Sequence, residues 1–227
     1  MTHGDAPRYP LPRGAIERLR MRIADLRHRG IYRGAADQHQ AIFVHIPNTA
    51  GSSIAGHLFD APSAHRTCQD YLDANPAKFR RYYKFCFVRN PWDRLVSTFF
   101  FLKAGGMNAD DRAFAAATLG RFDEFNDFVC DWLTPENIWR WVHFYPQYYF
   151  TTDSEGTDRV DFVGRFESID ADFATIAERF GANPTLPVAN RSDRPAFGEV
   201  YTAESRARVE AVYAEDIRRF RYAFPAD

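Results

Sequence analysis

The sequence predicts an α/β fold, with a central parallel sheet flanked by helices and preceded by a helical N-terminal arm. Two short runs, at 41–46 and 83–88, are apolar and rich in β-branched or aromatic residues, as buried parallel strands are. Each run leads into a loop and then into a segment with helical character. Strands that alternate with helices in this way are typical of parallel sheets with right-handed crossovers.

The bulk composition is that of an ordinary globular protein. The 227 residues are 45% hydrophobic and 26% charged, which is enough for one α/β domain with a sizeable core. The net charge of −1 gives no global signal for nucleic acid, so we expect no such partner. No apolar run approaches the length of a membrane span, and the first residues lack the order of a signal peptide, so we expect a cytoplasmic protein. The three cysteines have no metal-ligand spacing, which predicts reduced thiols and no metal site.

Residues 1–40 are predicted to form an arm ahead of a domain at 41–227. A helix is expected over 13–29, where arginines alternate with four apolar residues at helical spacing: Ile16, Leu19, Ile23 and Leu26. A basic amphipathic helix can make a peripheral contact with an anionic membrane or bind a partner. Packing of the helix on its own domain is the interpretation that we favour.

The remaining elements are expected from apolar periodicity. Helices should follow the two strands, at 54–59 and 92–102, and a third strand is expected at 160–163. Further helices are expected at 110–119, 122–132, 168–180 and 203–219.

The loop Pro47–Ser53 joins the first strand to its helix and carries small and hydroxyl residues. Backbone N–H groups at a helix N-terminus lack intrahelical partners and, with the helix dipole, favour an anion. Gly51 allows close approach of the backbone, and hydroxyls can add hydrogen bonds. The alternative is an ordinary capped helix. The loop is not a Walker A motif, because the first glycine and the Gly-Lys pair are missing.

The second motif begins at Arg89, which the second strand delivers to the edge of the sheet where open α/β sheets bind ligands. Ser97 lies eight residues further on in the following helix. A guanidinium and a hydroxyl together suit one phosphate group. The alternative is that Arg89 pairs with Asp93 or another acid.

Together these motifs resemble the sulfotransferase family. IFVHIPNTAGSSI at 42–54, followed after about forty residues by FVRNPWDRLVSTFFFLKAGG at 87–106, is most similar to the branch that includes carbohydrate sulfotransferases and many bacterial relatives. The resemblance extends through AHRT, HFYPQ, VDFVGRFESID and YAEDIRRFRY, and it covers nearly everything from 41 to 222.

The resemblance implies a P-loop-like sheet, a donor and a reaction. The donor is 3′-phosphoadenosine-5′-phosphosulfate (PAPS), its product is PAP, and no metal is needed. The 5′-phosphosulfate would be cradled by Thr49, Ala50, Gly51, Ser52 and Ser53. The 3′-phosphate would be held by Arg89 and Ser97, and a later loop would add charge through Arg191 or Arg194. The acceptor would be a hydroxyl of a carbohydrate, a glycolipid or a small metabolite.

His65 matches the position at which relatives carry a catalytic-base histidine. Attack on sulfur needs an acceptor hydroxyl that loses its proton, and a histidine suits that task. A surface or capping role is the alternative. His143 is the second candidate, either orienting the acceptor or packing beside the site, whereas His45 is expected to be a hydrogen-bonded core residue.

Asn48 is the main departure from the family, whose members usually have lysine there. That lysine meets the oxygen on which charge develops as the S–O bond breaks. In the first alternative Asn48 suffices with slower chemistry; in the second another cation replaces the lysine, with Lys103, Arg191 and Arg194 as candidates. In the third alternative the protein is a weak or inactive PAP- or PAPS-binding protein, natural or engineered.

Overall fold

The computed structural model describes residues 7–186 and 197–225, which form two compact units. Residues 7–88 and 147–186 form the sheet unit, and the remaining described residues form the helical unit. No helix of the described ranges combines the length and the apolar character needed to cross a bilayer.

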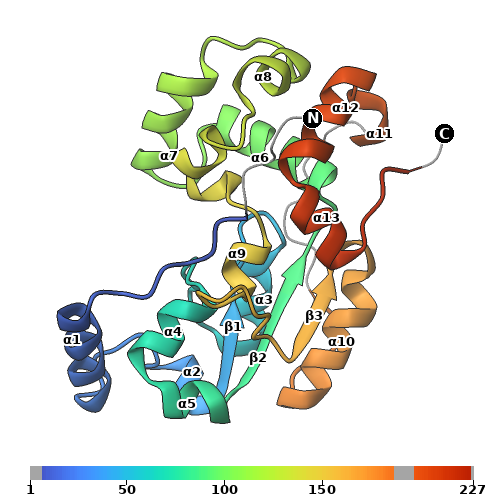
Figure 1. Cartoon of the computed structure of the whole chain (residues 1–227). Coiled ribbons are helices and arrows are strands. Elements are labelled where there is room, and N and C mark those ends of the chain that lie inside the picture. The colour runs from blue at the N-terminus through green and yellow to red at the C-terminus, as the bar shows by residue number, and fades with distance from the viewer. Residues whose placement is uncertain (1–6, 187–196, 226–227) are drawn as a thin grey trace. The chain divides into compact units, whose positions relative to one another are not determined.

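The sheet unit contains three strands and a set of mostly short helices (Figure 1). In chain order its elements are α1 (Ala15–Leu26), α2 (Ala35–His39), β1 (Ala41–Val44), α3 (Gly51–Phe59), α4 (Cys68–Ala74), α5 (Pro76–Arg81), β2 (Tyr83–Val88), α9 (Tyr148–Thr151), β3 (Phe162–Arg165), η4 (Phe166–Ser168) and α10 (Ile169–Phe180).

The three strands form one parallel sheet in the order β1-β2-β3, with β2 in the middle (Figure 1). Ile42 pairs with Lys84 across β1 and β2, and Cys86 pairs with Val163 across β2 and β3. The predicted α/β class with a parallel sheet flanked by helices is therefore confirmed. Parallel pairing brings the carboxyl ends of all three strands to the same edge of the sheet.

Both faces of the sheet are covered, as the apolar character of the strands predicts. Phe43, Phe85 and Phe87 share one face and pack against α3 and α10, whose buried contributors include Ile54, Leu58, Phe173 and Ile176. On the other face, the Lys84 ammonium donates to the carbonyl of Phe79 in α5.

The third strand begins two residues later than predicted and ends at Arg165. The Asp161 carboxylate accepts a hydrogen bond from the Lys84 backbone, which ties the chain beside β2 just before the ladder begins. A Cβ atom at Gly164 would lie 2.5 Å from the Phe87 ring. The absence of a side chain at Gly164 leaves room for the Phe87 ring, so β3 can continue beyond the apolar residues that predicted it.

Helix α1 contacts α4, but the side that faces the protein is polar. Asp25 is buried, and its carboxylate accepts hydrogen bonds from Asn75 and Lys78. Arg13, just before the helix, donates to Asp70 of α4. The helix thus packs on its own unit as expected, although its apolar residues do not provide the contact.

The helical unit comprises α6 (Pro91–Lys103), α7 (Ala109–Phe114), η1 (Ala115–Leu119), α8 (Phe125–Trp132), η2 (Asn137–Arg140), η3 (Val142–Phe144), α11 (Phe197–Val200), α12 (Ala203–Val212) and α13 (Ala214–Phe220). Its core is largely aromatic and includes Trp92, Phe99, Phe128, Trp132 and Phe144. The single helix predicted at 203–219 is interrupted at Tyr213, whose hydroxyl donates to the Phe144 carbonyl.

Candidate functional site

The loop between β1 and α3 contains two residues in the left-handed region. Asn48 has a φ of 64° and Ala50 a φ of 65°. Asparagine tolerates this conformation better than most residues, whereas alanine is strained in it. Thr49, between them, is fully buried, and its hydroxyl donates to the carbonyl of Ile46 at 2.8 Å. That hydroxyl therefore stabilises the turn within the loop.

Helix α3 begins at the end of this loop, at Gly51, and no side chain of the described residues caps it. Its first amides have the orientation that favours an anion. Ser52 is exposed and Ser53 half-buried, and neither hydroxyl makes a hydrogen bond within the described part of the chain. Both predicted hydroxyl donors are thus placed at the first turn of the helix.

Gly51 is required by the packing of the loop. A Cβ atom at this position would lie only 1.9 Å from Cδ2 of His45. The His45 ring is buried beneath the helix start, and its Nδ1 lies 2.7 Å from the Ser63 hydroxyl. His45 is therefore a hydrogen-bonded interior residue, and its ring packs directly beneath Gly51 of the loop.

His65 lies next to the ring of His45. Its ring centroid is 4.4 Å from that of His45, and its Nδ1 lies 3.1 Å from the His45 carbonyl oxygen. A carbonyl oxygen can only accept, so Nδ1 carries the hydrogen of the neutral ring and Nε2 is the basic nitrogen. The structure thus brings His65 together with the loop, in the tautomer that a base acting through Nε2 requires.

Arg89 and Ser97 lie in the helical unit, at the start of α6 and along it. Arg89 is buried, and its Nε donates to Asp93 at 2.6 Å. The ion pair that the sequence offered as an alternative is therefore present. Ser97 is half-buried, and its hydroxyl makes no hydrogen bond to the residues that the structure describes.

His143 lies in the interior of the helical unit. Its ring packs 5.1 Å from that of Phe101, and its Nε2 is 3.4 Å from the buried carboxylate of Asp111. The same carboxylate accepts a hydrogen bond from the Trp141 indole. These contacts favour a packing role for His143 over direct proton transfer.

Of the three cations proposed to replace the missing lysine, the structure describes only Lys103. The Lys103 ammonium donates to the Phe122 carbonyl at 2.6 Å, at the C-terminal end of α6. It is thus engaged in holding the end of that helix. Arg191 and Arg194 lie outside the described residues.

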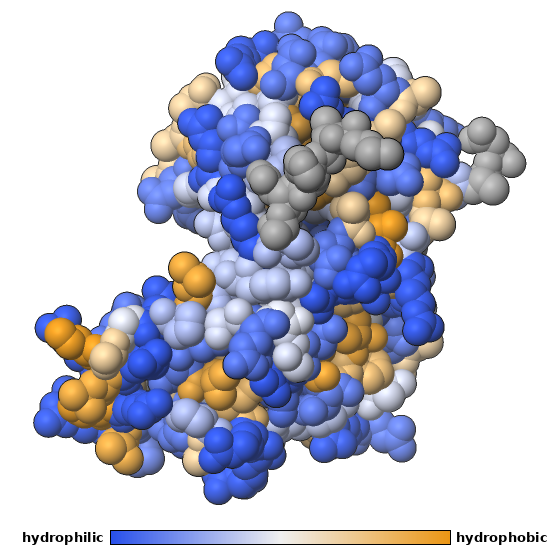
Figure 2. Space-filling model, in the orientation of Figure 1, coloured by the Kyte–Doolittle hydropathy of each residue, from blue (hydrophilic) through white to orange (hydrophobic). Residues whose placement is uncertain are grey.

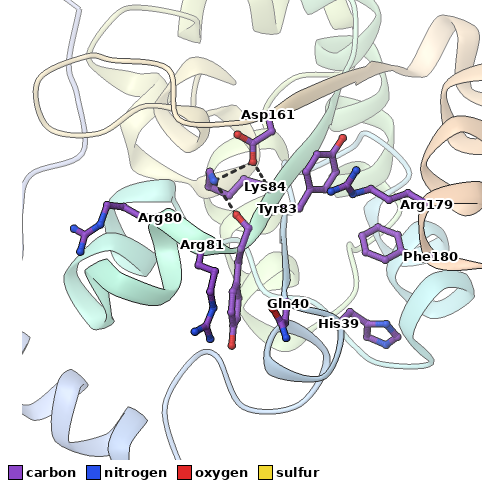
Figure 3. A pocket seen from close by; sticks show the side chains of 10 residues that line it. His39, Gln40, Arg80, Arg81, Tyr83, Lys84, Asp161, Arg179 and Phe180 are labelled. Carbon is purple, nitrogen blue, oxygen red and sulfur yellow. Dashed lines mark hydrogen bonds and ion pairs between the residues drawn. The ribbon is translucent and has the colours of Figure 1, made fainter.

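A cavity of about 630 Å³ opens at the opposite edge of the sheet from the loop (Figure 3). Its lining includes Gln40, Tyr83 and Asp161, which stand at or just before the amino ends of the three strands. The Arg179 guanidinium lies over the Tyr83 ring, 3.7 Å from its centroid. The Lys84 ammonium is held by Asp161 and by two carbonyls. The loop 47–53 and His65 lie at the other edge of the sheet, beyond the carboxyl end of β1.

The described residues contain no group of three or more His, Cys, Asp or Glu side chains placed to bind a metal ion. A family model with the description "Sulfotransferase family" matches residues 35–223, which is most of the chain. The chain belongs to the sulfotransferase family. The same comparison covers every candidate site residue of this sulfotransferase, whereas α1 precedes the matched range. No curated protein and no solved structure gives a significant match.

Three partners of the candidate residues are not identified by sequence reasoning. The His45 carbonyl and the Ser63 hydroxyl support His65 and the loop, and Asp111 holds His143. Of these partners, only Ser63 could have been found from the sequence, because it lies two residues before His65. Asp111 is far from His143 in the chain and has no motif around it.

Proposed function

We propose that this sulfotransferase moves a sulfuryl group from PAPS to an acceptor hydroxyl, with His65 as general base. The observation that carries the proposal is the hydrogen bond between His65 and the carbonyl of His45, the residue that leads into the loop 47–53. It supports a base beside the anion-binding loop, with its basic nitrogen set by the backbone.

In the proposed reaction the loop and the first turn of α3 bind the 5′-phosphosulfate, while Arg89 and Ser97 bind the 3′-phosphate. Nε2 of His65 takes the proton of the acceptor hydroxyl as its oxygen attacks sulfur. A new S–O bond forms, the bond from sulfur to the bridging oxygen breaks, and PAP leaves with that electron pair. Backbone N–H groups and the Asn48 amide would stabilise the charge on the departing oxygen.

The acceptor that we propose is a hydroxyl of a carbohydrate, a glycolipid or a small metabolite. Asn48 supports a second candidate function, a PAP- or PAPS-binding protein with weak or no transfer activity. Asparagine donates a hydrogen bond but brings no positive charge to the bridging oxygen. The two functions share a donor site and differ only in turnover.

An acceptor screen with sulfur-labelled PAPS tests the proposal. We expect label to appear on one class of acceptor, with PAP formed in equal amount. PAP binding without turnover on any acceptor would favour the binding protein. Equal affinities for PAP, AMP and ADP would contradict both functions, because the 3′-phosphate would then contribute nothing.

A further inference from the structure

The outward face of α1 carries an unusual number of exposed apolar side chains. Eight large hydrophobic side chains are exposed in these residues, and five of them fall between residues 11 and 26: Leu11, Ile16, Leu19, Ile23 and Leu26. Ile16 is 71% exposed and Leu26 is 78% exposed. Figure 2 shows hydrophobic atoms gathered over α1, at the left of the sheet unit. A surface helix normally turns such residues towards the core.

The orientation of α1 is set by ionic contacts on its opposite side. Ile16 and Asp25 are about two and a half turns apart, so they lie on opposite sides of the helix. Asp25 is buried against Asn75 and Lys78 of the α5 region. The apolar stripe, formed by Ile16, Leu19, Ile23 and Leu26, is therefore exposed, with Ile16 opposite Asp25 and Leu19 at the edge that lines a groove beside α4.

Arginines line both edges of the apolar stripe. At 100° per residue, Arg20 and Arg27 lie on one edge and Arg22 on the other. Within the described residues, five arginines of this segment have no acidic partner: Arg18, Arg20, Arg22, Arg27 and Arg29. The two acidic residues of the segment form ion pairs with other residues: Glu17 pairs with Arg13, and Asp25 pairs with Lys78.

We propose that α1 is a membrane-surface anchor that inserts its apolar stripe between the headgroups of anionic phospholipids. Apolar side chains flanked by arginines fit the boundary between acyl chains and headgroups, where long cationic side chains reach the phosphates. A second copy of the chain is a poorer occupant, because paired stripes would bring two sets of unpaired arginines together. A groove of about 510 Å³ between α1 and α4, lined in part by Leu19, Leu72 and Arg22, adjoins the stripe and adds room for a lipid.

Sedimentation with lipid vesicles tests the anchor with the full chain. We expect binding to vesicles of phosphatidylcholine containing about one third phosphatidylglycerol, and at least tenfold weaker binding to phosphatidylcholine alone. Binding should also fall as salt rises towards about 0.5 M, because the headgroup attraction is screened. The double variant Leu19→Ser/Ile23→Ser should lose at least tenfold in binding. Its thermal unfolding should change little, because neither side chain belongs to the buried core.

The matched control is Met107→Ser, which removes a side chain that is 75% exposed in the helical unit. This variant should bind vesicles like the original chain. Failure of the original chain to bind anionic vesicles, or equal binding by the Leu19→Ser/Ile23→Ser variant, would overturn the anchor. A lipid-free dimer that the double variant dissociates would instead assign the stripe to contact between copies, and light scattering detects it. Sulfuryl transfer to a water-soluble acceptor should be the same in both variants, so failure of the anchor is distinct from failure of the proposed function.

Discussion

The imidazole of His65 donates through Nδ1 to the backbone carbonyl of His45, which lies between β1 and the loop 47–53. The acceptor is a main-chain atom at the end of a buried strand, so the position of the His65 ring is coupled to the sheet itself. The side chain of His45 is at the same time packed under Gly51. One residue therefore supports both the proposed base and the loop 47–53.

Replacement of His65 by alanine should lower the rate of sulfuryl transfer by about 10²–10⁴-fold, the usual effect of losing a positioned base. PAP affinity should stay within a few-fold, because the proposed nucleotide contacts are made by other residues. Single-turnover transfer and calorimetry measure the two effects. His143→Ala is the comparison, and it should lower thermal stability by exposing a gap beside buried Asp111. If His143→Ala instead removes turnover from a folded protein and His65→Ala does not, the assignment of the base is wrong.

Arg89→Lys should weaken PAP binding about tenfold while leaving AMP binding unchanged. Lysine keeps a positive charge beside Asp93 but loses the fork that binds two phosphate oxygens. Alanine is a poorer choice here, since an unpaired buried carboxylate destabilises a protein by about 3–5 kcal/mol. Ser97→Ala, which disturbs no ion pair, should lower the ratio of PAP to AMP affinity by about two- to tenfold. Equal losses for PAP and AMP would show that neither residue contacts the 3′-phosphate.

Asn48→Lys should raise the transfer rate at least tenfold, because one charge-stabilising group is worth about 10²–10³-fold. PAP affinity should stay within a few-fold. The substitution should also lower the free energy of unfolding by about 1 kcal/mol, because lysine is less tolerant than asparagine of a left-handed backbone. Asn48→Gly is the control: it accepts the backbone without strain but has no amide, so its rate should fall. An unchanged or lower rate for Asn48→Lys would mean that another cation already serves the bridging oxygen.

Gly51→Ala should destabilise the fold by about 1–3 kcal/mol, because the added methyl group overlaps the His45 ring. The matched control is Gly56→Ala in the same helix, where an added Cβ meets nothing within 4 Å. That variant should gain up to about 1 kcal/mol from helix propensity. Urea unfolding of the two variants compares the effects, and equal stability would contradict the packing of His45 under the loop.

The buried thiols should resist alkylation in the native state. Burial raises the pKa of Cys68 well above its ordinary value of 9.0 and also raises the pKa of Cys86. Cys130 is only half-buried, so mass spectrometry should find it labelled first. Because the folded thiols ionise at higher pH than the unfolded ones, the free energy of unfolding should fall as pH rises above about 9. Rapid labelling of Cys86 in the folded protein would contradict its burial.

The framework of the sheet unit is predictable from short runs of sequence. The predicted second strand coincides with β2 (Tyr83–Val88), and the first has the same start as β1 (Ala41–Val44), because a strand buried on both faces needs a continuous apolar run. The loop and Arg89 follow from the same reasoning, since they come directly after those strands.

Contacts between distant parts of the chain are what the sequence does not predict. The helix predicted at 203–219 is interrupted at Tyr213, whose hydroxyl donates to the Phe144 carbonyl, and nothing near position 213 indicates that partner. The sequence also does not predict which side of α1 packs on the sheet unit. The pattern of apolar residues gives the stripe, but the packed side is the one that carries buried Asp25. Periodicity identifies a face of a helix, and only tertiary contacts decide what it faces.

The overlap that a side chain at position 51 would make with His45 has an evolutionary consequence. Any larger residue at 51 must displace the ring at 45, and movement of that strand end shifts the carbonyl that holds His65. Substitutions at these three positions should therefore be inherited together. Among homologues we expect them to covary as a triplet, so that a lineage that replaces the histidine at 45 also becomes free to change the glycine.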